Sequence, residues 1–447
     1  MRKRLLGLAS FLAGTAAIAA GPEILPVVDL SAQKMPDMPR QEESDTPRQL
    51  PSVPEELLAK PPTGAGCPVC LPEPPCKFLP EPCACNACCK PVQRYWANVE
   101  YLLWFVKDEP LNAVLFTQGP PASGGRLGAP GVRPLVGGGD IDLGSFNGGR
   151  ITAGYWCNTT GTIGVEASGF VLERGGDSFS LAGGPNDPLA IARPFFNPLT
   201  SAEAARFVTS PPGALGNVFT AASSHLWGAN ADLLLNVRDR STYRVDAIVG
   251  FDYLDLRETL VVGDRTFSPA AVGTNVTTLD SFASHNQFYG ADLGLRGNVK
   301  RGRVEFIPTF KVALGVTHEV SENVGRTDFV TTGGTFTSPA GFLVVGSNSG
   351  QQVRDRFAAV PELNLKLAYR LCEHVNVFAA YDILYWSDVV RPGDQVDRVI
   401  NPLQVPALTG GNPTPVAALP GPVRPSNDAI RGDFFAQGVS LGFGVTY

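Results

Sequence analysis

Three short patterns in the sequence resemble motifs of catalysis or adhesion, in part or in full. The run Gly438–Gly442 fits the G-x-S-x-G elbow of serine hydrolases, in which the serine sits at the apex of a strand-to-helix turn. Ser440 lies instead inside a strand-like run with no helix after it. His318 and Glu319 lack the second histidine of an H-E-x-x-H zinc site, and the adhesion tripeptide Arg431–Asp433 lies at a loop-to-strand junction. We therefore expect no catalytic residue, no metal site and no cofactor.

The composition limits the functions that the chain can have. The chain has 447 residues, four histidines, 17% charged residues and a net charge of −6, so it has no basic footprint for nucleic acid. A hydrolytic barrel would hold a serine, a histidine and an acid near its outer rim. His225 and His285 could be considered for that role, but the alternation of the surrounding residues turns both toward lipid. The sequence predicts a protein that is not an enzyme and does not bind nucleic acid.

Seven of the nine cysteines crowd into one proline-rich segment and are candidates for disulfide bonds: Cys67, Cys70, Cys76, Cys83, Cys85, Cys88 and Cys89. The C-x-x-C pair at Cys67 and Cys70 could begin a zinc site, but the segment has no histidine and its other spacings match no familiar zinc motif. An exported protein meets an oxidising compartment, where disulfides are expected. Seven is an odd number, so at least one thiol cannot pair within the segment, and it could reach Cys157, Cys372 or another chain. Bridges between chains would tie the protein to its own copies or to other envelope proteins.

The elements that precede the folded part are an export signal and a linker. Residues 1–20 join a basic start, Arg2–Arg4, to the apolar run Leu5–Ile18 and an A-x-A cleavage pattern at Ala17–Ala19. This apolar run is shorter than the roughly 18 to 20 residues of a membrane-spanning helix. Residues 21–93 hold sixteen of the 39 prolines, which predicts a disordered, extended linker in the periplasm.

From residue 94 to residue 447 apolar residues alternate with polar ones, which is typical of strands. Ten segments show this period: 94–107, 148–157, 161–172, 223–237, 243–255, 282–299, 303–316, 357–371, 375–387 and 434–447. Short connections alternate with long ones at 108–147, 173–222, 256–280, 317–353 and 388–433. This rhythm favours an all-β, antiparallel, up-and-down transmembrane barrel with short periplasmic turns and long, structureless extracellular loops, over a soluble β-sandwich. The stretch Gly341–Gly346 could form a hairpin inside a loop, or it could raise the strand count from ten to twelve.

The charges inside these strands fall on the parity opposite to the apolar residues. They are predicted to face the lumen: Glu100, Arg150, Glu166, Asp232, Arg244, Asp246, Asp252, Asp292, Arg296, Glu305, Lys311, Glu362, Lys366, Arg370 and Asp382. An arginine or lysine on the lipid face at mid-depth would cost about 2–4 kcal/mol. Nine acids and six bases can form either a salt-bridged plug or a narrow, mildly cation-favouring pore, and the sequence leaves both open.

The last strand resembles a signal that barrel-insertion machinery reads. Its apolar face consists of alternate residues that end at an aromatic C-terminus: Val439, Leu441, Phe443, Val445 and Tyr447. Such a strand offers an edge for strand addition. The alternative is an ordinary closing strand. We expect barrel-assembly machinery to be a partner.

Several ordered runs in the chain together resemble one protein family. They are Glu100–Trp104, Gly149–Trp156, Gly164–Glu166, Phe170–Glu173, Tyr243–Leu260 and Tyr289–Asp292. They are similar to the beta-barrel porin-7 family of planctomycete-type outer-membrane proteins, over about residues 94–447. The resemblance implies an outer-membrane barrel and supplies no catalytic residues.

These inferences predict a protein exported through a cleaved signal peptide into the outer membrane, where lipid surrounds it. Its expected function is that of a narrow porin-like channel or of a structural envelope barrel cross-linked through its cysteine-rich arm. The alternative is a surface interaction or adhesion protein that acts through its long extracellular loops.

Overall fold

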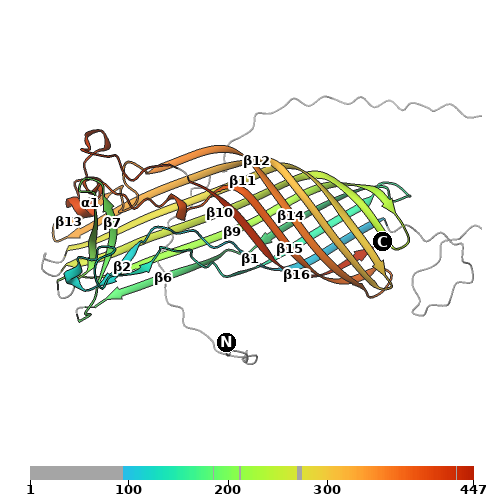
Figure 1. Ribbon diagram of the computed structural model, residues 1–447, viewed down its shortest axis with the longest axis horizontal. Helices are drawn as coiled ribbons and strands as arrows, with labels where there is room; N and C mark the ends of the chain where they lie inside the picture. Colours follow the sequence, from blue (N-terminus) through green and yellow to red (C-terminus); the bar gives the residue numbers. More distant parts are fainter. Residues whose placement is uncertain (1–93, 185, 211–212, 269–273, 429) are drawn as a thin grey trace, which may run out of the picture. The chain divides into compact units, whose positions relative to one another are not determined.

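The computed structural model describes residues 94–184, 186–210, 213–268, 274–428 and 430–447, and its main feature is a ring of ten antiparallel strands (Figure 1). The ring runs through β1 (Tyr95–Val106), β4 (Ser145–Trp156), β5 (Ile163–Leu172), β9 (Leu215–Asp239), β10 (Tyr243–Ser268), β11 (Thr274–Arg301), β12 (Val304–Thr331), β14 (Gly350–Arg370), β15 (Val375–Val390) and β16 (Arg431–Thr446). Strand β16 pairs with β1, with Trp96 opposite Thr446, so that the first and last strands of the chain are neighbours. The predicted signal peptide and linker, residues 1–93, lie outside the described residues.

The ring has two different ends. Four short turns, at residues 157–162, 240–242, 302–303 and 371–374, lie at one end, which we call the turn end. The other end, the loop end, carries the long connections (Figure 1). Three neighbouring strands, β10, β11 and β12, reach 26, 28 and 28 residues and extend far toward the loop end.

The expectation that residues 256–280 and 317–353 are structureless loops is therefore wrong for most of their described length. Residues 256–268 and 274–280 continue β10 and β11, and residues 317–331 continue β12. The strand period is hard to see there because outward positions become polar, as at Glu322, Arg326 and Asp328. Gly341–Gly346 forms no strand; residues 341–345 are a buried bend whose amides at Phe342, Leu343 and Val344 donate to Asp280 Oδ1 at 2.8–2.9 Å.

The remaining loop-end segments also have structure. Strand β6 (Gly175–Gly183) adds to β9, and β13 (Gly334–Ser338) adds to β12. A separate four-stranded sheet has the order β3 (Arg133–Val136), β2 (Phe116–Gly119), β7 (Ala190–Asn197) and β8 (Ala202–Thr209). Single helical turns occur at η1 (Pro121–Ser123), η3 (Gly393–Gln395), η4 (Pro402–Gln404), α1 (Pro406–Thr409) and η5 (Val416–Ala418). Among the described residues, none of these helices has the length or apolar character to cross a membrane.

The two faces of the ring differ as the period of two requires. Outward side chains of the turn-end half are apolar and open: Tyr101, Phe251, Leu293, Phe310 and Leu441 are 50–63% exposed. The residues that alternate with them point inward. They divide into a charged zone toward the turn end and an apolar core toward the loop end.

Candidate functional site

Inward-facing polar side chains line a cavity of about 360 Å³ in the turn-end half of the ring. Of the fifteen charged residues predicted to face the lumen, all but Asp292 line this cavity. Asp292 is fully buried beside it and is bonded to Lys311, with Asp292 Oδ2 2.7 Å from Lys311 Nζ. The cavity extends from Trp96 and Thr446 near the turn end to Trp104 and Leu384 at the edge of the apolar core.

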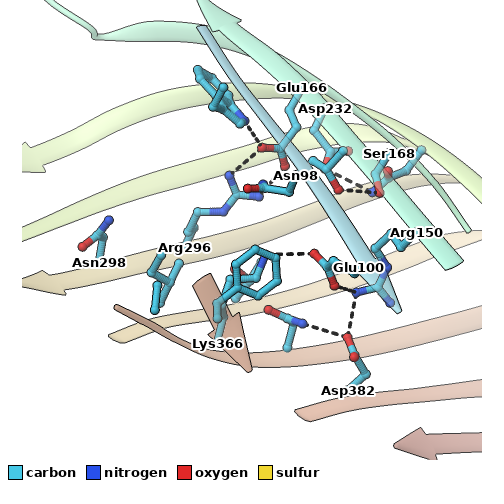
Figure 2. Close-up of a pocket in the computed structure, with 18 of the residues that line it drawn as sticks. Asn98, Glu100, Arg150, Glu166, Ser168, Asp232, Arg296, Asn298, Lys366 and Asp382 are labelled. Atoms are coloured by element: carbon cyan, nitrogen blue, oxygen red, sulfur yellow. Dashed lines mark hydrogen bonds and ion pairs between the residues drawn. The ribbon is translucent and has the colours of Figure 1, made fainter. Parts of the chain in front are cut away.

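The first charge network joins four strands across the cavity. Arg150 on β4 donates to Asp382 of β15 at 2.9 Å and to Glu100 of β1 at 3.3 Å. Lys366 on β14 reaches the other oxygen of Glu100 at 3.0 Å. Figure 2 shows Arg150 between Glu100 and Asp382, which point toward it from neighbouring parts of the wall. Two cations and two anions thus compensate one another within the network.

A second network lies across the cavity from the first (Figure 2). Glu166 of β5 accepts hydrogen bonds from Arg296 of β11 at 2.6 and 3.1 Å and from Trp96 Nε1 at 2.6 Å. Nearer the turn end, the Nε of Arg244 is 2.9 Å from both oxygens of Asp246, and its guanidinium stacks 4.0 Å from the Trp156 ring.

The remaining predicted charges occur at the turn-end mouth and mid-wall. Glu305 accepts from Arg370 and from Asn298 at 3.2 Å. Glu362 lines the cavity opposite Lys311 in the β12–β14 register.

Lys311 is the centre of a third network. Its Nζ lies 3.4 Å from Asp232 Oδ2, 3.1 Å from Asp252 Oδ1 and 2.7 Å from Asp292 Oδ2. All four side chains are at most 7% exposed. One ammonium group is thus shared by three carboxylates. Such burial of charge is favourable only where partners compensate it.

On the loop-end side of these charges, the inner face of the ring becomes apolar. Inward side chains from many strands of the ring are 0–2% exposed there: Leu102, Trp104, Phe146, Leu172, Leu226, Leu254, Leu256, Phe288, Leu384, Trp386 and Phe434. Segments of the long connections add Leu111, Leu115, Phe116, Ile191, Phe342 and Ile400 to the same cluster. The lumen is therefore filled by close-packed side chains toward the loop end.

Arg391 fixes one of these connections inside the ring. It follows β15, is completely buried, and donates to Glu258 of β10 at 2.7 and 3.0 Å and to Glu109 at 3.1 Å. Its Nη1 also donates to the carbonyl of Asp108 at 2.7 Å. Burial and the nearby charge of Glu258 raise the pKa of Glu109 to about 8, although Arg391 opposes the shift. Arg391 and its two acids were not predicted from the sequence.

Arg193 fixes the four-stranded sheet to the inside of the ring in the same way. From β7 its guanidinium reaches Asp264 of β10 at 3.0 Å and Asp280 of β11 at 2.8 Å. Arg206 of β8 reaches the second oxygen of Asp264 at 2.6 Å. Burial tends to raise the pKa of Asp264, but the two arginines reverse the effect and lower it. The only sequence signal was a charge of inward parity within segments assigned to loops.

The motif residues lie apart from these networks. Ser440 is buried on the inner face of β16 with no helix after it. His285 is on the outer surface of β11, where its Nε2 is 2.8 Å from Asp255, and His225 lies on β9 opposite Arg257. Asp433 of the adhesion tripeptide is paired with Lys107.

Other predicted residues occur at the turn end. Cys157 and Cys372 are exposed and unpaired, whereas the seven clustered cysteines lie outside the described residues. The residues of the proposed assembly signal are on the outer face of β16, and Leu441, Phe443 and Tyr447 are 54–66% exposed. The outer face of this strand is therefore a row of open apolar side chains.

Comparison with known proteins gives one family and several distant structures. A family model described as "Putative beta barrel porin-7" matches residues 96–447. No curated protein matches the chain. The outer membrane protease OmpT of Escherichia coli is similar at 8% identity and a TM-score of 0.37, over 80% of this chain and 97% of that one. A FadL homologue of Pseudomonas aeruginosa (7%, TM-score 0.20) and the toluene transporter TbuX of Ralstonia pickettii (8%, TM-score 0.18) each match over 79% of this chain and 90% of their own.

Proposed function

The chain belongs to the beta barrel porin-7 family and is an outer-membrane β-barrel protein, and we propose that it is a closed, ten-stranded transmembrane barrel with a structural, non-enzymatic role in the envelope. One observation carries the structural role. The loop-end half of the lumen holds a cluster of buried side chains such as Trp104, Phe288 and Trp386, which are at most 2% exposed, and this packing supports a lumen that does not conduct. The paired charges of the cavity support the same conclusion, since paired side chains fill a barrel of this size.

The outward face supports the placement in lipid. Exposed apolar residues cover the turn-end half of the ring, and aromatic side chains such as Trp227, Tyr253 and Tyr289 form a contacting row with ring centroids 5.0–5.1 Å apart. Aromatic rows of this kind lie at the membrane–water interface of barrels. Inward orientation of the charges keeps them away from the hydrocarbon.

Planar-bilayer recording of the refolded full-length chain tests the structural role. We expect no steady single-channel steps from protein whose folding is verified by circular dichroism. Steady conductance steps would contradict the closed barrel.

The excess of acids in the cavity makes a narrow, cation-favouring channel the second candidate. In that case, Asp246→Asn combined with Asp252→Asn should reduce the cation preference of the steps. A conductance whose ion preference stays unchanged in this double variant would come from leakage around the barrel and would not support the channel.

The arm would connect the barrel to its neighbours. Cys157 and Cys372 are both exposed near the turn end, which is also where β1 begins and residue 94 joins the arm. We propose that cysteines of residues 67–89 form disulfides that include at least one bond outside the arm. Non-reducing electrophoresis should show covalent oligomers or mixed species that collapse to the monomer with reductant. A monomer band alone in the absence of reductant would contradict cross-linking between chains.

We propose that the two ends of the chain carry the signals for export and for insertion into the outer membrane. Edman sequencing of the mature protein should begin near residue 20, after removal of the signal peptide. Deleting Tyr447 should lower the amount of barrel in the outer membrane, because the exposed apolar row on β16 loses its terminal aromatic. Unchanged outer-membrane levels would contradict a role of this row in assembly.

A further inference from the structure

Two buried carboxylate oxygens in the wall of the barrel face one another without a donor. Lys311 engages Asp232 and Asp292 through their Oδ2 atoms. The Oδ1 atoms of both residues are buried and have no hydrogen-bond partner within the described part of the chain. The side chains are 3% and 0% exposed, so bulk solvent does not compensate these oxygens. An isolated buried carboxylate oxygen costs free energy unless a proton, a donor or a cation meets it.

Gly250 creates the space into which both oxygens point. It lies on β10, directly opposite Asp232 of β9 and Asp292 of β11 in the two registers. A Cβ built on Gly250 would stand 2.3 Å from Asp232 Oδ1 and 2.6 Å from Asp292 Oδ1. Any other residue would therefore occupy the place where the two oxygens converge. The absence of a side chain at this position opens a small polar cradle.

A third carboxylate and the net charge complete the arrangement. One oxygen from each of Asp232, Asp252 and Asp292 lies within 4.8 Å of the others. Among the described residues, Lys311 is the one cation bonded to these three carboxylates, and Glu362 lies opposite it in the β12–β14 register, so acidic groups outnumber the cation in the cluster. Arg296, the next cation along the wall, is bonded to Glu166.

We propose that the Oδ1 atoms of Asp232 and Asp292, which Lys311 leaves free, bind a divalent cation of the calcium type, with the carboxylate of Asp252 beside them. Hard cations prefer carboxylate oxygens, and Ca²⁺ accepts irregular ligand sets completed by water more readily than Mg²⁺ does. A dication also compensates carboxylate charge that Lys311 alone does not. Asp232 and Asp252 line the cavity, which gives the ion a route to the site. Bound there, the ion would join β9 to β11 across β10, whether or not the barrel conducts.

Calcium titration of the refolded full-length protein in detergent tests this site. Isothermal titration calorimetry should show one Ca²⁺ per chain, with weaker binding of Mg²⁺, and Ca²⁺ should raise the unfolding temperature. Asp292→Asn should weaken binding about tenfold or more, because the number of ligand charges sets Ca²⁺ affinity. Gly250→Ala should have a similar effect, because its methyl group would fill the cradle while all three aspartates and Lys311 remain.

Asp382→Asn is the matched control. Asp382 is also a buried cavity aspartate with one unpartnered oxygen, but its charge is met by Arg150. This variant should bind Ca²⁺ like the unaltered protein. Circular dichroism and the heat-dependent gel shift of folded barrels identify variants that fail to fold. If Asp292→Asn does not fold, Ca²⁺ binding by Gly250→Ala and Asp232→Asn tests the site instead. The proposal is overturned if the unaltered protein binds no Ca²⁺, which is the result expected if the two oxygens share a proton. It is also overturned if folded Gly250→Ala and Asp292→Asn bind Ca²⁺ as well as the unaltered protein does.

Discussion

The two halves of the barrel interior handle charge in different ways. In the turn-end half, charges line a cavity, and residues such as Arg150, Lys366 and Arg296 keep 15–21% of their side-chain surface exposed. In the loop-end half, Arg193 and Arg391 are 0–1% exposed and surrounded by apolar packing. A cavity that admits water screens the loss of a partner, whereas a dry core does not. The loop-end pairs should therefore be the more important for stability.

The difference also concerns what the charges hold together. Cavity pairs join one strand of the ring to another, either to a neighbour, as Glu100 and Arg150 do on β1 and β4, or to a strand three positions away, as Arg296 does with Glu166 of β5. Loop-end pairs join a long connection to the wall, as Arg391 does with Glu258. Hydrogen-bonded strands remain together without their charges, but the connections depend on theirs. The packing of the loop end thus depends on a few buried ions as well as on the apolar core that surrounds them.

Removing the charge of Arg391 should have the largest effect. Arg391→Met leaves Glu109 and Glu258 together in an apolar core without their cation. Removing one partner of a buried ion pair lowers the free energy of unfolding by about 3–5 kcal/mol. Limited proteolysis should then cut residues 388–433 much faster, and the denaturant midpoint should fall. Arg431→Met is a control, since Arg431 lies in the same region but is 64% exposed at its side chain. Equal protease resistance of Arg391→Met and the unaltered protein would contradict the buried lock.

The pH dependence of the loop end should come next. Burial, together with the charges of Glu258 and Asp394, raises the pKa of Glu109 from 4.5 to about 8 on folding, against the opposing effects of Arg391 and of the Gly393 amide. Because the folded state favours the protonated acid, this contribution is present below pH 4.5 and is lost as pH rises through 8. The slope is at most about 1.4 kcal/mol per pH unit for one proton.

Hydrogen exchange of residues 388–428 between pH 5 and pH 9 would measure this slope after correction for intrinsic exchange rates. Glu109→Gln should flatten it, because the amide does not titrate. A slope that is the same in Glu109→Gln would assign the effect to other groups of the loop end.

Gly393→Ala should weaken the same contact by a smaller amount. A Cβ on Gly393 would lie 1.8 Å from the carbonyl oxygen of Pro110 and 3.0 Å from Glu109 Oε1, so η3 would have to move away. Such overpacking costs about 1–3 kcal/mol. Gly139→Ala is the comparison, because nothing lies within 4 Å of a Cβ there and its φ is not in the left-handed region. Thermal unfolding that is equally affected in both variants would argue against a tight contact at η3.

The sequence predicts the turn-end half far better than the loop-end half, and the reason is physical. Lipid-type apolar residues on one parity, as at Tyr101 and Phe251, leave the other parity for Glu100 and Asp252, so a local period suffices. The family resemblance, which depends mostly on these strands, is confirmed. No local period indicates that Arg391 pairs with Glu109, since 282 residues separate them.

The strand extensions were missed for a related reason. Beyond the apolar belt, outward residues such as Arg326 and Asp328 meet water, so both faces of the strand carry polar residues and the alternation disappears. The third network shows a different limit. Parity assigns Asp232, Asp292 and Lys311 to one face, but which oxygen remains without a donor depends on side-chain geometry that spacing does not encode.

Replacing a cavity cation should have the smallest effect of these changes. Lys366→Met removes one of the two cations bound to Glu100, but Arg150 still pairs with this carboxylate, and its guanidinium lies over the rings of Trp104 and Phe170. The side chain of Lys366 is 16% exposed, and its Nζ lies 4.1 Å from the centroid of the Phe378 ring, where the methionine would exchange a cation–π contact for an apolar one. We expect a loss of about 1 kcal/mol or less, as for other partly screened ion pairs. Denaturant unfolding of Lys366→Met and Arg391→Met measures this contrast. A loss of stability in Lys366→Met as large as that in Arg391→Met would mean that the cavity is as dry as the loop-end core. The two halves would then hold their charges in the same way.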